Sequence, residues 1–285
     1  MSRIDPTHRI CALFGHPVGH SLSPAIHNAA FAALGIPLVY VAHDIAPGQI
    51  KEGIAAIRTL NYRGLSVTIP HKVCALSCMD EVDPTANAIG CINTVVNDNG
   101  RLRGYNSDGR GALNALREAG ADPKGQRVLM LGSGGGARAI SMTLALEARP
   151  QNLSILSIDD TELTKLTNDI TQRSGLKVDG LTLNDHNLKY AINQSDILLH
   201  CTPVGQSPNQ SQSLVPTSLL RNDLAVFDIV YNPRRTQLLQ QAAAAGCRII
   251  EGVEMFLGQA LVQFELWTGK KPPVEVMRQV LLERL

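Results

Sequence analysis

A glycine-rich turn carries the clearest chemical signal in this sequence. The apolar run 127–131 leads into Gly132-Ser-Gly134-Gly135-Gly136-Ala137, and a helical pattern follows. A strand that ends at glycine and turns into a helix leaves backbone N–H groups open at the helix N-terminus, and these groups and the helix dipole favour a phosphate. Gly132 permits the turn, Gly134 lets the backbone approach a pyrophosphate, and Ala137 allows close helix–strand packing.

An aspartate strengthens this interpretation. Residues 153–158 predict the next strand, and Asp159 follows it. It lies roughly 20 residues beyond the turn, where dinucleotide-binding proteins place an acidic reader of the ribose. The alternative is a glycine-rich loop without a ligand, but strand, helix and aspartate together favour a dinucleotide site.

Three polar clusters suit a small polyhydroxylated acid. They are Ser21-Leu-Ser23, Ser66-Val-Thr68-Ile-Pro-His-Lys72 and Asn106-Ser-Asp108. Each lies where a predicted element ends, and ligand sites collect at such ends in open α/β sheets. Purely structural roles are the alternative: Ser23 as a helix cap, Lys72 as a solvated amine, Asp108 at a helix start. Their occurrence beside a dinucleotide fingerprint favours a substrate site.

The composition limits the class of protein. The 285 residues are enough for two domains, and 44% apolar with 18% charged residues is typical of a globular protein. A net charge of +1 gives no basic field, so we expect no nucleic-acid partner and no membrane partner. The sequence has neither a signal-peptide pattern nor an apolar run long enough to span a membrane, so we expect a soluble cytoplasmic protein.

Metal binding is not expected. The six cysteines include no Cys-x-x-Cys pair, and Cys74 and Cys78 have no histidine pair at ligand-like spacing. We therefore expect buried or half-buried thiols. His16 and His20 flank a turn and are expected to be loop residues.

The elements that must position these residues follow an α/β pattern. In the first hundred residues we expect strands at 10–14, 38–42 and 64–70, helices at 23–34 and 50–60, and a hairpin over 91–105. Later we expect helices at 107–119, 136–148 and 161–173, strands at 127–131, 153–158, 181–183, 196–201, 225–229 and 248–250, and a helical closing segment. Such alternation implies right-handed βαβ units and a parallel sheet.

Eight motifs then occur in one order along the chain. They are Gly19-His-Ser-Leu-Ser-Pro24, Ser66–Lys72, Gly90-Cys-Ile-Asn-Thr94, Gly104-Tyr-Asn-Ser-Asp-Gly109, Gly132–Ala137, Cys201-Thr-Pro-Val-Gly205, Asp228-Ile-Val-Tyr-Asn-Pro233 and Gly252-Val-Glu-Met255 with Gln259. This order resembles the shikimate/quinate dehydrogenases over about residues 10–285. The glycine turn alone is unspecific, whereas the ordered set is highly specific.

The resemblance implies a fold and a reaction. It implies an N-terminal α/β substrate-binding and catalytic domain at 1–109, a Rossmann doubly wound parallel-sheet domain at 110–247, and C-terminal helices at 248–285 that pack on the first domain. The implied enzyme transfers a hydride between NAD(P) and a ring hydroxyl of shikimate or quinate, with 3-dehydroshikimate or 3-dehydroquinate as the ketone.

The resemblance also assigns site residues. Lys72 and Asp108 would be the catalytic pair. Ser21 and Ser23 would bind the substrate carboxylate near Tyr231. Thr68, Asn93 and Gln259 would hydrogen-bond the ring hydroxyls, and Ser66 would also belong to the substrate site. The dinucleotide would lie against Gly132, Gly134, Gly135, Gly136, Ala137, Asp159, Thr202, Pro203, Val230 and Gly252.

The catalytic pair also makes chemical sense. Hydride loss from a secondary alcohol requires loss of the hydroxyl proton, so a positioned acid–base group helps. A lysine must be deprotonated to act as that base, and a neighbouring carboxylate opposes its deprotonation. We therefore expect Lys72 to be the acid–base group and Asp108 to orient it and the substrate hydroxyl.

Two departures from the family pattern concern specificity. NADP-dependent members carry Asn-Arg-Thr where this chain has Ser157-Ile158-Asp159. An aspartate accepts hydrogen bonds from ribose hydroxyls and repels a 2′-phosphate, and no Lys or Arg occurs between 150 and 164. We predict NAD rather than NADP. Ser66 replaces an asparagine and leaves room for quinate, whereas the Ser21/Ser23 pair is typical of shikimate enzymes, so the substrate stays open.

Two other functions remain as alternatives. One is a dehydrogenase of a related ring acid, such as aminoshikimate. The other is a non-catalytic regulator that senses quinate or shikimate, against which the intact Lys72/Asp108 pair and the complete glycine turn argue. Whether the enzyme is a monomer or a homodimer, and biosynthetic or catabolic, also stays open.

Overall fold

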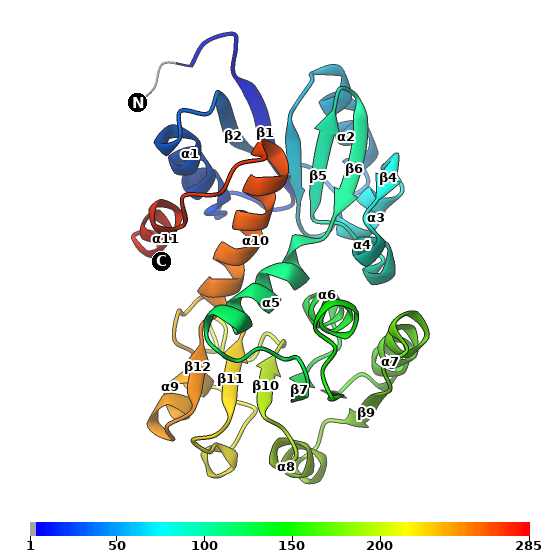
Figure 1. Cartoon of the computed structure of the whole chain (residues 1–285), viewed down its shortest axis with the longest axis vertical. Helices are drawn as coiled ribbons and strands as arrows, with labels where there is room; N and C mark the ends of the chain where they lie inside the picture. The colour runs from blue at the N-terminus through cyan, green and yellow to red at the C-terminus, as the bar shows by residue number, and fades with distance from the viewer. Residues whose placement is uncertain (1–3) are drawn as a thin grey trace. The chain divides into compact units, whose positions relative to one another are not determined.

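The computed structural model describes residues 4–285. The chain forms two compact units, each built around a six-stranded sheet. Unit 1 comprises the chain up to Ser107 together with Gln259–Leu285, and unit 2 comprises Asp108–Gly258. The chain thus leaves unit 1 and returns to it, as the colours of Figure 1 show. The predicted α/β fold is confirmed.

Unit 1 holds a mixed sheet in the order β2-β1-β3-β5-β6-β4. β1 is parallel to β2 and β3, whereas β5 is antiparallel to β3 and β6 as in the predicted hairpin. The strands are β1 Arg9–Gly15, β2 Leu38–Asp44, β3 Gly64–Val67, β4 Glu81–Val82, β5 Thr94–Asp98 and β6 Arg101–Tyr105. The helices are α1 Ser23–Ala33, α2 Ile50–Thr59, α3 Lys72–Leu76, α4 Pro84–Ile89 and α11 Val274–Leu282.

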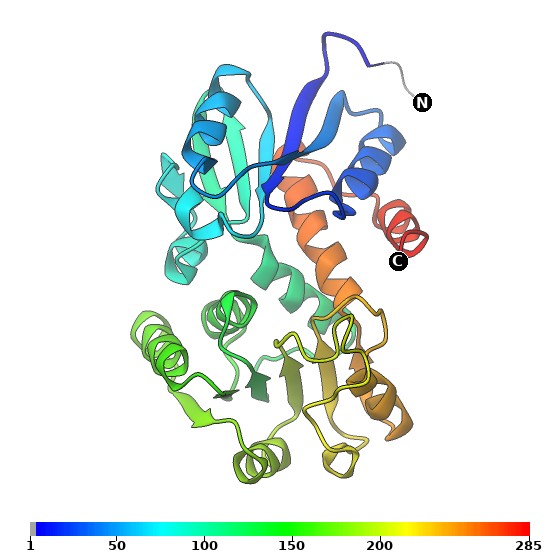
Figure 2. The same cartoon turned by 180° about the vertical axis from the view of Figure 1, so that it is seen from behind.

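The two faces of this sheet bury different side chains. On one face, Leu65 and Val67 of β3 pack in a cluster with Ile54 and Ile57 of α2. On the other face, a methyl group added at Gly64 would lie 2.1 Å from Trp267 Nε1. Only glycine therefore lets the indole lie directly on β3. Figure 2 shows the sheet of unit 1 from behind.

Unit 2 holds an all-parallel sheet in the order β12-β11-β10-β7-β8-β9. The strands are β7 Arg127–Leu131, β8 Asn152–Ser157, β9 Val178–Thr182, β10 Ile197–His200, β11 Ala225–Asp228 and β12 Arg248–Ile250. Between them come α6 Gly135–Thr143, the π-helical turn η1 Leu144–Ala148, α7 Asp160–Ser174, α8 Asp185–Asn193, the 3-10 turn η2 Thr217–Leu219 and α9 Gln237–Ala244. This order is that of a doubly wound Rossmann sheet.

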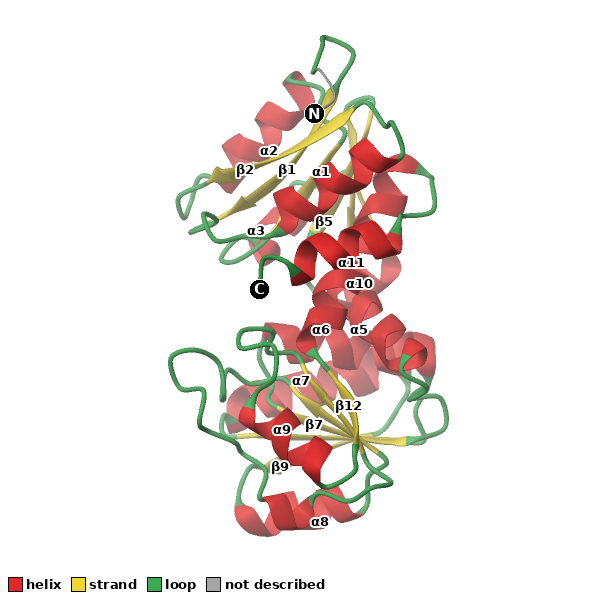
Figure 3. Ribbon diagram, turned by 90° about the vertical axis from the view of Figure 1, so that its left-hand side faces the viewer, coloured by secondary structure: helices red, strands yellow, loops and turns green. Residues whose placement is uncertain are grey.

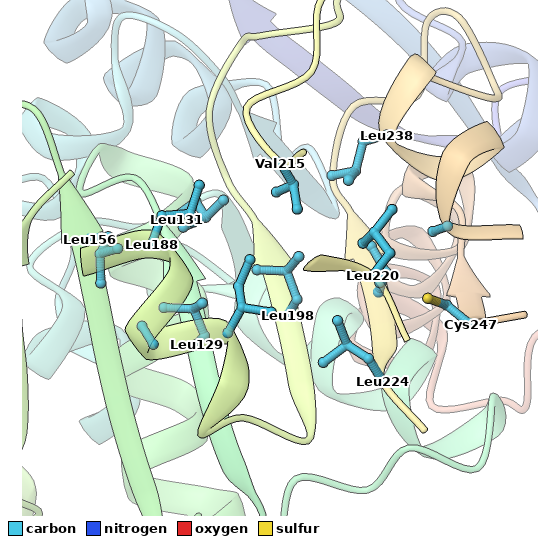
Figure 4. Close-up of a cluster of buried hydrophobic side chains, with 14 of the residues drawn as sticks. Leu129, Leu131, Leu156, Leu188, Leu198, Val215, Leu220, Leu224, Leu238 and Cys247 are labelled. Atoms are coloured by element: carbon cyan, nitrogen blue, oxygen red, sulfur yellow. The ribbon is translucent and has the colours of Figure 1, made fainter. Parts of the chain in front are cut away.

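A leucine-rich cluster covers one face of this sheet (Figure 4). Leu129, Leu198 and Val226 from three neighbouring strands meet Leu188 of α8 and Leu238 of α9. Figure 3 shows helices on both faces of the sheet. Because both faces are covered, the central strands β7, β10 and β11 are buried almost throughout, as parallel strands in such a sheet require.

Two helices contain a boundary between the units. α5 (Ser107–Glu118) begins at the last residue of the first stretch of unit 1, and α10 (Gly252–Thr268) contains the boundary after Gly258. Residues 248–258, expected with the C-terminal helices, are assigned to unit 2 in this division. The roles given to the three segments at 1–109, 110–247 and 248–285 stay predictions.

Several local expectations need correction. Ser23 does not cap α1, because Leu22 is the N-cap and makes no side-chain cap bond. Instead the N–H of Ser23 donates to Ser21 Oγ at 3.3 Å. β9 begins at Val178, earlier than expected, because its half-exposed residues lack a clear apolar pattern. The short helices α3 and α4 lie in a segment for which no element was predicted.

Candidate functional site

The glycine turn lies at the point where the strand order of unit 2 reverses, between β7 and β10. Gly132 has a φ of +105°, and a Cβ there would lie 2.8 Å from the carbonyl oxygen of Cys201. Gly134 is the N-cap of α6, and a Cβ on Gly134 or Gly135 would meet no atom within 4 Å. The helix N-terminus is therefore open, which fits a pyrophosphate. Ala137 is fully buried against the sheet.

Asp159 lies two residues after the end of β8 and is exposed. Its Oδ1 accepts a hydrogen bond from the N–H of Glu162 at 2.9 Å, so it also caps α7. Beside it the hydroxyls of Ser133 and Ser157 lie 2.8 Å apart and tie the glycine turn to the end of β8. The cap uses one hydrogen-bond acceptor site of the carboxylate, which has several. Asp159 can therefore cap α7 and still accept hydrogen bonds from a ribose, as predicted.

A buried imidazole–carboxylate pair lies where β10 and β11 end. His200 and Asp228 are register partners, with exposures of 1% and 0%. His200 Nδ1 lies 2.8 Å from Asp228 Oδ1, and its Nε2 lies 2.6 Å from Thr202 Oγ1. The carboxylate also accepts from Val230 N at 3.0 Å and from Thr236 Oγ1 at 2.6 Å. We call Thr202, His200, Asp228 and Thr236 the ionic network.

The ionic network holds two segments that were expected to bind the dinucleotide. Thr202 leads into the exposed Pro203, and Val230 N–H is fixed by Asp228. A Cβ on Gly252 would lie 2.5 Å from the carbonyl oxygen of Val230, so the start of α10 approaches this backbone closely. Tyr231 follows, with its ring 5.3 Å from that of Phe256, and burial raises the pKa of its hydroxyl.

In unit 1 the polar residues that were predicted to bind the substrate come from several elements. Ser21 precedes α1, Thr68 follows β3, and Lys72 is the first residue of α3. The carbonyl oxygen of Lys72 accepts from Ile92 N at 3.0 Å, and Val67 N donates to the carbonyl of Asn93 at 2.8 Å. The backbone therefore brings the segments that carry Lys72 and Asn93 together.

Asn93 and Ser66 belong to one chain of buried hydrogen bonds. Tyr40 Oη lies 2.7 Å from Ser66 Oγ, which lies 3.0 Å from Gln263 Oε1. Gln263 Nε2 lies 3.1 Å from Thr94 Oγ1, which lies 2.7 Å from Asn93 Oδ1. Ser107 closes the chain with its N–H, 2.8 Å from Asn93 Oδ1. We call Tyr40, Ser66, Gln263, Thr94, Asn93 and Ser107 the neutral chain, because none of these side chains is charged.

Aromatic rings pack against one end of the neutral chain. The ring of His27 stacks on Tyr40 with centroids 4.7 Å apart and lies 5.1 Å from Trp267. His27 is fully buried, and burial lowers its pKa to about 3. Burial also raises the pKa of Tyr40, an effect that the side chains of Ser66 and Ser23 partly oppose. At neutral pH His27 is therefore uncharged and Tyr40 keeps its proton.

The expected site residues divide between the units. Ser21, Ser23, Ser66, Thr68, Lys72, Asn93 and Gln259 belong to unit 1, and Asp108, Tyr231 and all the expected dinucleotide residues belong to unit 2. Asp108 is the first residue of unit 2 and directly follows Ser107 of the neutral chain. The pairing of Lys72 with Asp108 stays a prediction.

Sequence reasoning gave no site role to seven members of the two networks, namely Tyr40, Thr94, Ser107, His200, Asp228, Thr236 and Gln263. Gln263 lies four positions after Gln259 on α10, a spacing that places both on one helix face, and this signal was available. His200 and Asp228 end neighbouring parallel strands, which was also readable. Tyr40 lies in the middle of β2, where only the tertiary structure shows that its hydroxyl meets Ser66.

Residues 4–285 lack two features that mark other classes of protein. No group of three or more His, Cys, Asp or Glu side chains in this part of the chain could hold a metal ion. None of its helices is both long and apolar enough to cross a membrane.

Fold and turn together define a class: an α/β protein with a Rossmann domain of the dinucleotide-binding type. The substrate binding domain of shikimate dehydrogenase matches residues 13–95, and the C-terminal domain of shikimate 5′-dehydrogenase matches residues 252–282. A shikimate dehydrogenase (NADP(+)) of Methanopyrus kandleri is 41% identical over 285 residues, covering 99% of this chain and 98% of the relative. The chain therefore belongs to the shikimate/quinate dehydrogenase family.

Solved structures agree with this membership. The shikimate 5-dehydrogenase of Listeria monocytogenes, in complex with shikimate and NAD, has a TM-score of 0.95 at 36% identity and covers 99% of each chain. The quinate dehydrogenase of Corynebacterium glutamicum, in complex with NAD, has a TM-score of 0.90 at 31% identity, covering 97% of this chain and 99% of that one. The family resemblance drawn from the eight motifs is confirmed.

Proposed function

We propose that this protein is a nicotinamide-dependent dehydrogenase that oxidises a ring hydroxyl of shikimate or quinate, or reduces the matching ketone. The observation that carries the proposal is the similarity over 99% of the chain to a shikimate dehydrogenase. The open helix N-terminus behind Gly132 supplies the site for the pyrophosphate. When bound, the nicotinamide accepts the hydride from the alcohol carbon.

Lys72 serves as the acid–base group in this proposal. The hydroxyl proton moves to the amine of Lys72 as the C–H bond breaks, which leaves the ketone. Asp108 orients Lys72 and the substrate hydroxyl. Ser21 and Ser23 bind the carboxylate of the ring acid near Tyr231, and Ser66, Thr68, Asn93 and Gln259 contact the ring.

The preference for NAD over NADP is a second part of the proposal. Asp159 is an exposed carboxylate at the end of β8, where a 2′-phosphate would be repelled. The nearest cationic residues in sequence, Arg149 and Lys165, lie outside the segment 150–164. The relative from Methanopyrus kandleri is named for NADP(+), whereas the Listeria and Corynebacterium structures contain NAD, so the family accommodates both cofactors.

A substrate panel tests the activity. Absorbance of reduced nicotinamide is followed with NAD and with NADP against shikimate, quinate and an aminoshikimate-type acid. Oxidation of shikimate or quinate supports the proposal. Turnover of the aminoshikimate-type acid alone indicates a dehydrogenase of a related ring acid. Binding of quinate or shikimate without turnover indicates a sensor.

Substitution of Lys72 tests the chemical step. Lys72→Ala lowers kcat by about 10²–10⁴-fold, because a positioned acid–base group contributes on this scale, while KM for the ring acid changes less. Lys51→Ala on α2 is the matched control and keeps full turnover. Turnover of Lys72→Ala close to that of the unchanged protein removes Lys72 from the role.

Asp159→Asn tests the cofactor preference. Asparagine caps helices as well as aspartate does, so α7 is retained while the charge is lost. The ratio of kcat/KM for NAD to that for NADP falls about tenfold, corresponding to about 1.4 kcal/mol. Asp160→Asn, which also removes an exposed charge, shifts this ratio less. Equal shifts in the two variants would assign the preference to general charge.

A further inference from the structure

The proton positions along the neutral chain follow from one unambiguous donor. The backbone N–H of Ser107 can only donate, so the Asn93 atom 2.8 Å away is the amide oxygen. Thr94 Oγ1 lies 2.7 Å from this same oxygen, and because the oxygen only accepts, Thr94 donates its hydroxyl proton to Asn93. The orientation of the Asn93 amide is therefore fixed.

The proton positions from Thr94 to Tyr40 are fixed in turn. Thr94 has no second proton, so the atom of Gln263 that lies 3.1 Å away is the nitrogen Nε2. Gln263 then turns its oxygen to Ser66, and Ser66 donates to it at 3.0 Å. The proton of Ser66 is thereby committed, so the hydroxyl of Tyr40 donates to Ser66 at 2.7 Å.

Ser66 therefore has no proton to give to a ligand. A hydroxyl oxygen carries one proton and two lone pairs. The proton is donated to Gln263 and one lone pair accepts from Tyr40, which leaves one lone pair. A substituent that meets Ser66 must donate a hydrogen bond, as a hydroxyl does and a fluorine, ether or ketone does not.

We propose that Gln263 and Tyr40 are positioning residues for Ser66: Gln263 takes the proton of Ser66 and makes it an obligate hydrogen-bond acceptor, and Tyr40 occupies one of its lone pairs and so fixes the direction of the other. The substrate site then selects a ring hydroxyl at the carbon facing Ser66. This inference rests on the proposed function, because it takes Ser66 as a substrate contact. The aromatic packing of Tyr40 on His27 and the burial of Gln263 hold the chain in place.

Tyr40→Phe removes one hydroxyl and keeps the ring stacked on His27. It raises KM for the ring acid about three- to tenfold, the range for one hydrogen bond, with kcat within about twofold and KM for the dinucleotide unchanged. Tyr62→Phe, the same change outside the neutral chain, leaves all three constants unchanged. A melting curve confirms that each variant is folded.

A double-mutant cycle separates a positioning role from a general structural one. Ser66→Ala alone raises KM for the ring acid. If Tyr40 acts through Ser66, then Tyr40→Phe adds less than about twofold to KM in the Ser66→Ala background. Additive effects of the two changes overturn the proposal. Unchanged KM in folded Tyr40→Phe, or in Ser66→Ala, also overturns it.

Deoxyfluoro competitors test the selection directly. Fluorine is close to hydroxyl in size but cannot donate, so replacing one ring hydroxyl by fluorine weakens inhibition of the unchanged protein about tenfold or more at the carbon facing Ser66. In Ser66→Ala the same replacement weakens inhibition at that carbon less than about threefold. Equal losses in both proteins overturn the proposal. If the unchanged protein oxidises no ring acid in the substrate panel, the proposed function itself is refuted. That result precedes these experiments and is distinct from their outcomes.

Discussion

The two units bury polar networks of different kinds. Unit 1 holds the neutral chain, in which hydroxyls and amides pass hydrogen bonds from Tyr40 to Ser107. Unit 2 holds the ionic network, in which one carboxylate, that of Asp228, accepts from an imidazole, a backbone N–H and a hydroxyl. In the neutral chain each member depends on its neighbours, whereas in the ionic network the carboxylate of Asp228 is the shared acceptor of three donors.

This difference predicts how each network fails. A carboxylate only accepts, so its removal leaves all of its donors without a partner in a buried site. A hydroxyl can rotate and exchange donor for acceptor, so a chain of hydroxyls loses one contact at a time. We therefore expect a large loss of stability when Asp228, the hub of the ionic network, is removed. We expect smaller losses when a single member of the neutral chain is changed.

The largest expected effect comes from the hub. Asp228→Ala leaves His200, Val230 N–H and Thr236 without an acceptor, and each buried orphan costs about 1–3 kcal/mol. We expect the free energy of unfolding to fall by about 3–5 kcal/mol in denaturant titrations.

Asp228→Asn is the matched control for this prediction. The amide oxygen keeps two of the donors, and the hydroxyl of Thr236 can reverse to accept from the amide nitrogen. The loss in this variant should be less than half of that in Asp228→Ala. Similar losses in the two variants would show that charge, rather than the number of acceptors, holds the network.

The second prediction concerns His27, the titratable group that stacks on Tyr40 of the neutral chain. Burial lowers the pKa of His27 to about 3 in the folded protein, from 6.5 in an unfolded chain. The unfolded state therefore binds more protons between these values, so stability is complete above pH 6.5 and falls as the pH drops from 6.5 towards 3. At pH 5 the loss due to His27 is about 2 kcal/mol.

His27→Phe removes this dependence and keeps a ring against Tyr40. Denaturant titrations at pH 8, 6 and 5 should show a smaller acid loss in the variant, whatever its absolute stability. His186→Phe, at an exposed histidine, should keep the full loss. Parallel pH profiles for His27→Phe and the unchanged protein would contradict the assignment.

The smallest expected effect comes from the middle of the neutral chain. Thr94→Val keeps the shape of the side chain but leaves Gln263 Nε2 without its acceptor, while Asn93 Oδ1 still accepts from Ser107. We expect a loss of about 1 kcal/mol, measured by denaturant titration. Thr268→Val is the control, because the hydroxyl of Thr268 bonds to a carbonyl of its own helix, and should cost less. A loss as large as that of Asp228→Ala would erase the contrast between the networks.

Much of the fold was predictable because it depends on local patterns. The strands 127–131 and 248–250 were predicted with their observed bounds, since short apolar runs between polar turns identify strands. The short helices α3 and α4 were not predicted, because five or six residues cannot display a helical period. Ser23 resembled a cap in sequence, yet Leu22 occupies that position.

The candidate site was predictable only in part, for a physical reason. The role of Gly132 is readable from the local sequence, because this glycine ends an apolar run and begins a Gly-x-Gly-x-x-Ala turn, and its φ of +105° is one that favours glycine. The role of Ser66 is not, because its donor and acceptor character is set by Tyr40 and Gln263, which are distant in sequence. A motif records which residue is present, whereas the direction of its proton depends on partners that only the tertiary structure identifies.

The return of the chain to unit 1 has a consequence for biosynthesis. Gln263 and Trp267, which complete the interior of unit 1, are translated only after the whole of unit 2. During synthesis, the sheet of unit 1 therefore lacks Trp267 on one of its faces until the end of translation, whereas the Rossmann sheet of unit 2 can already fold. Unit 1, which begins at the N-terminus, is thus the last unit to complete its fold, and a chain that ended before Gln259 would leave unit 1 incomplete.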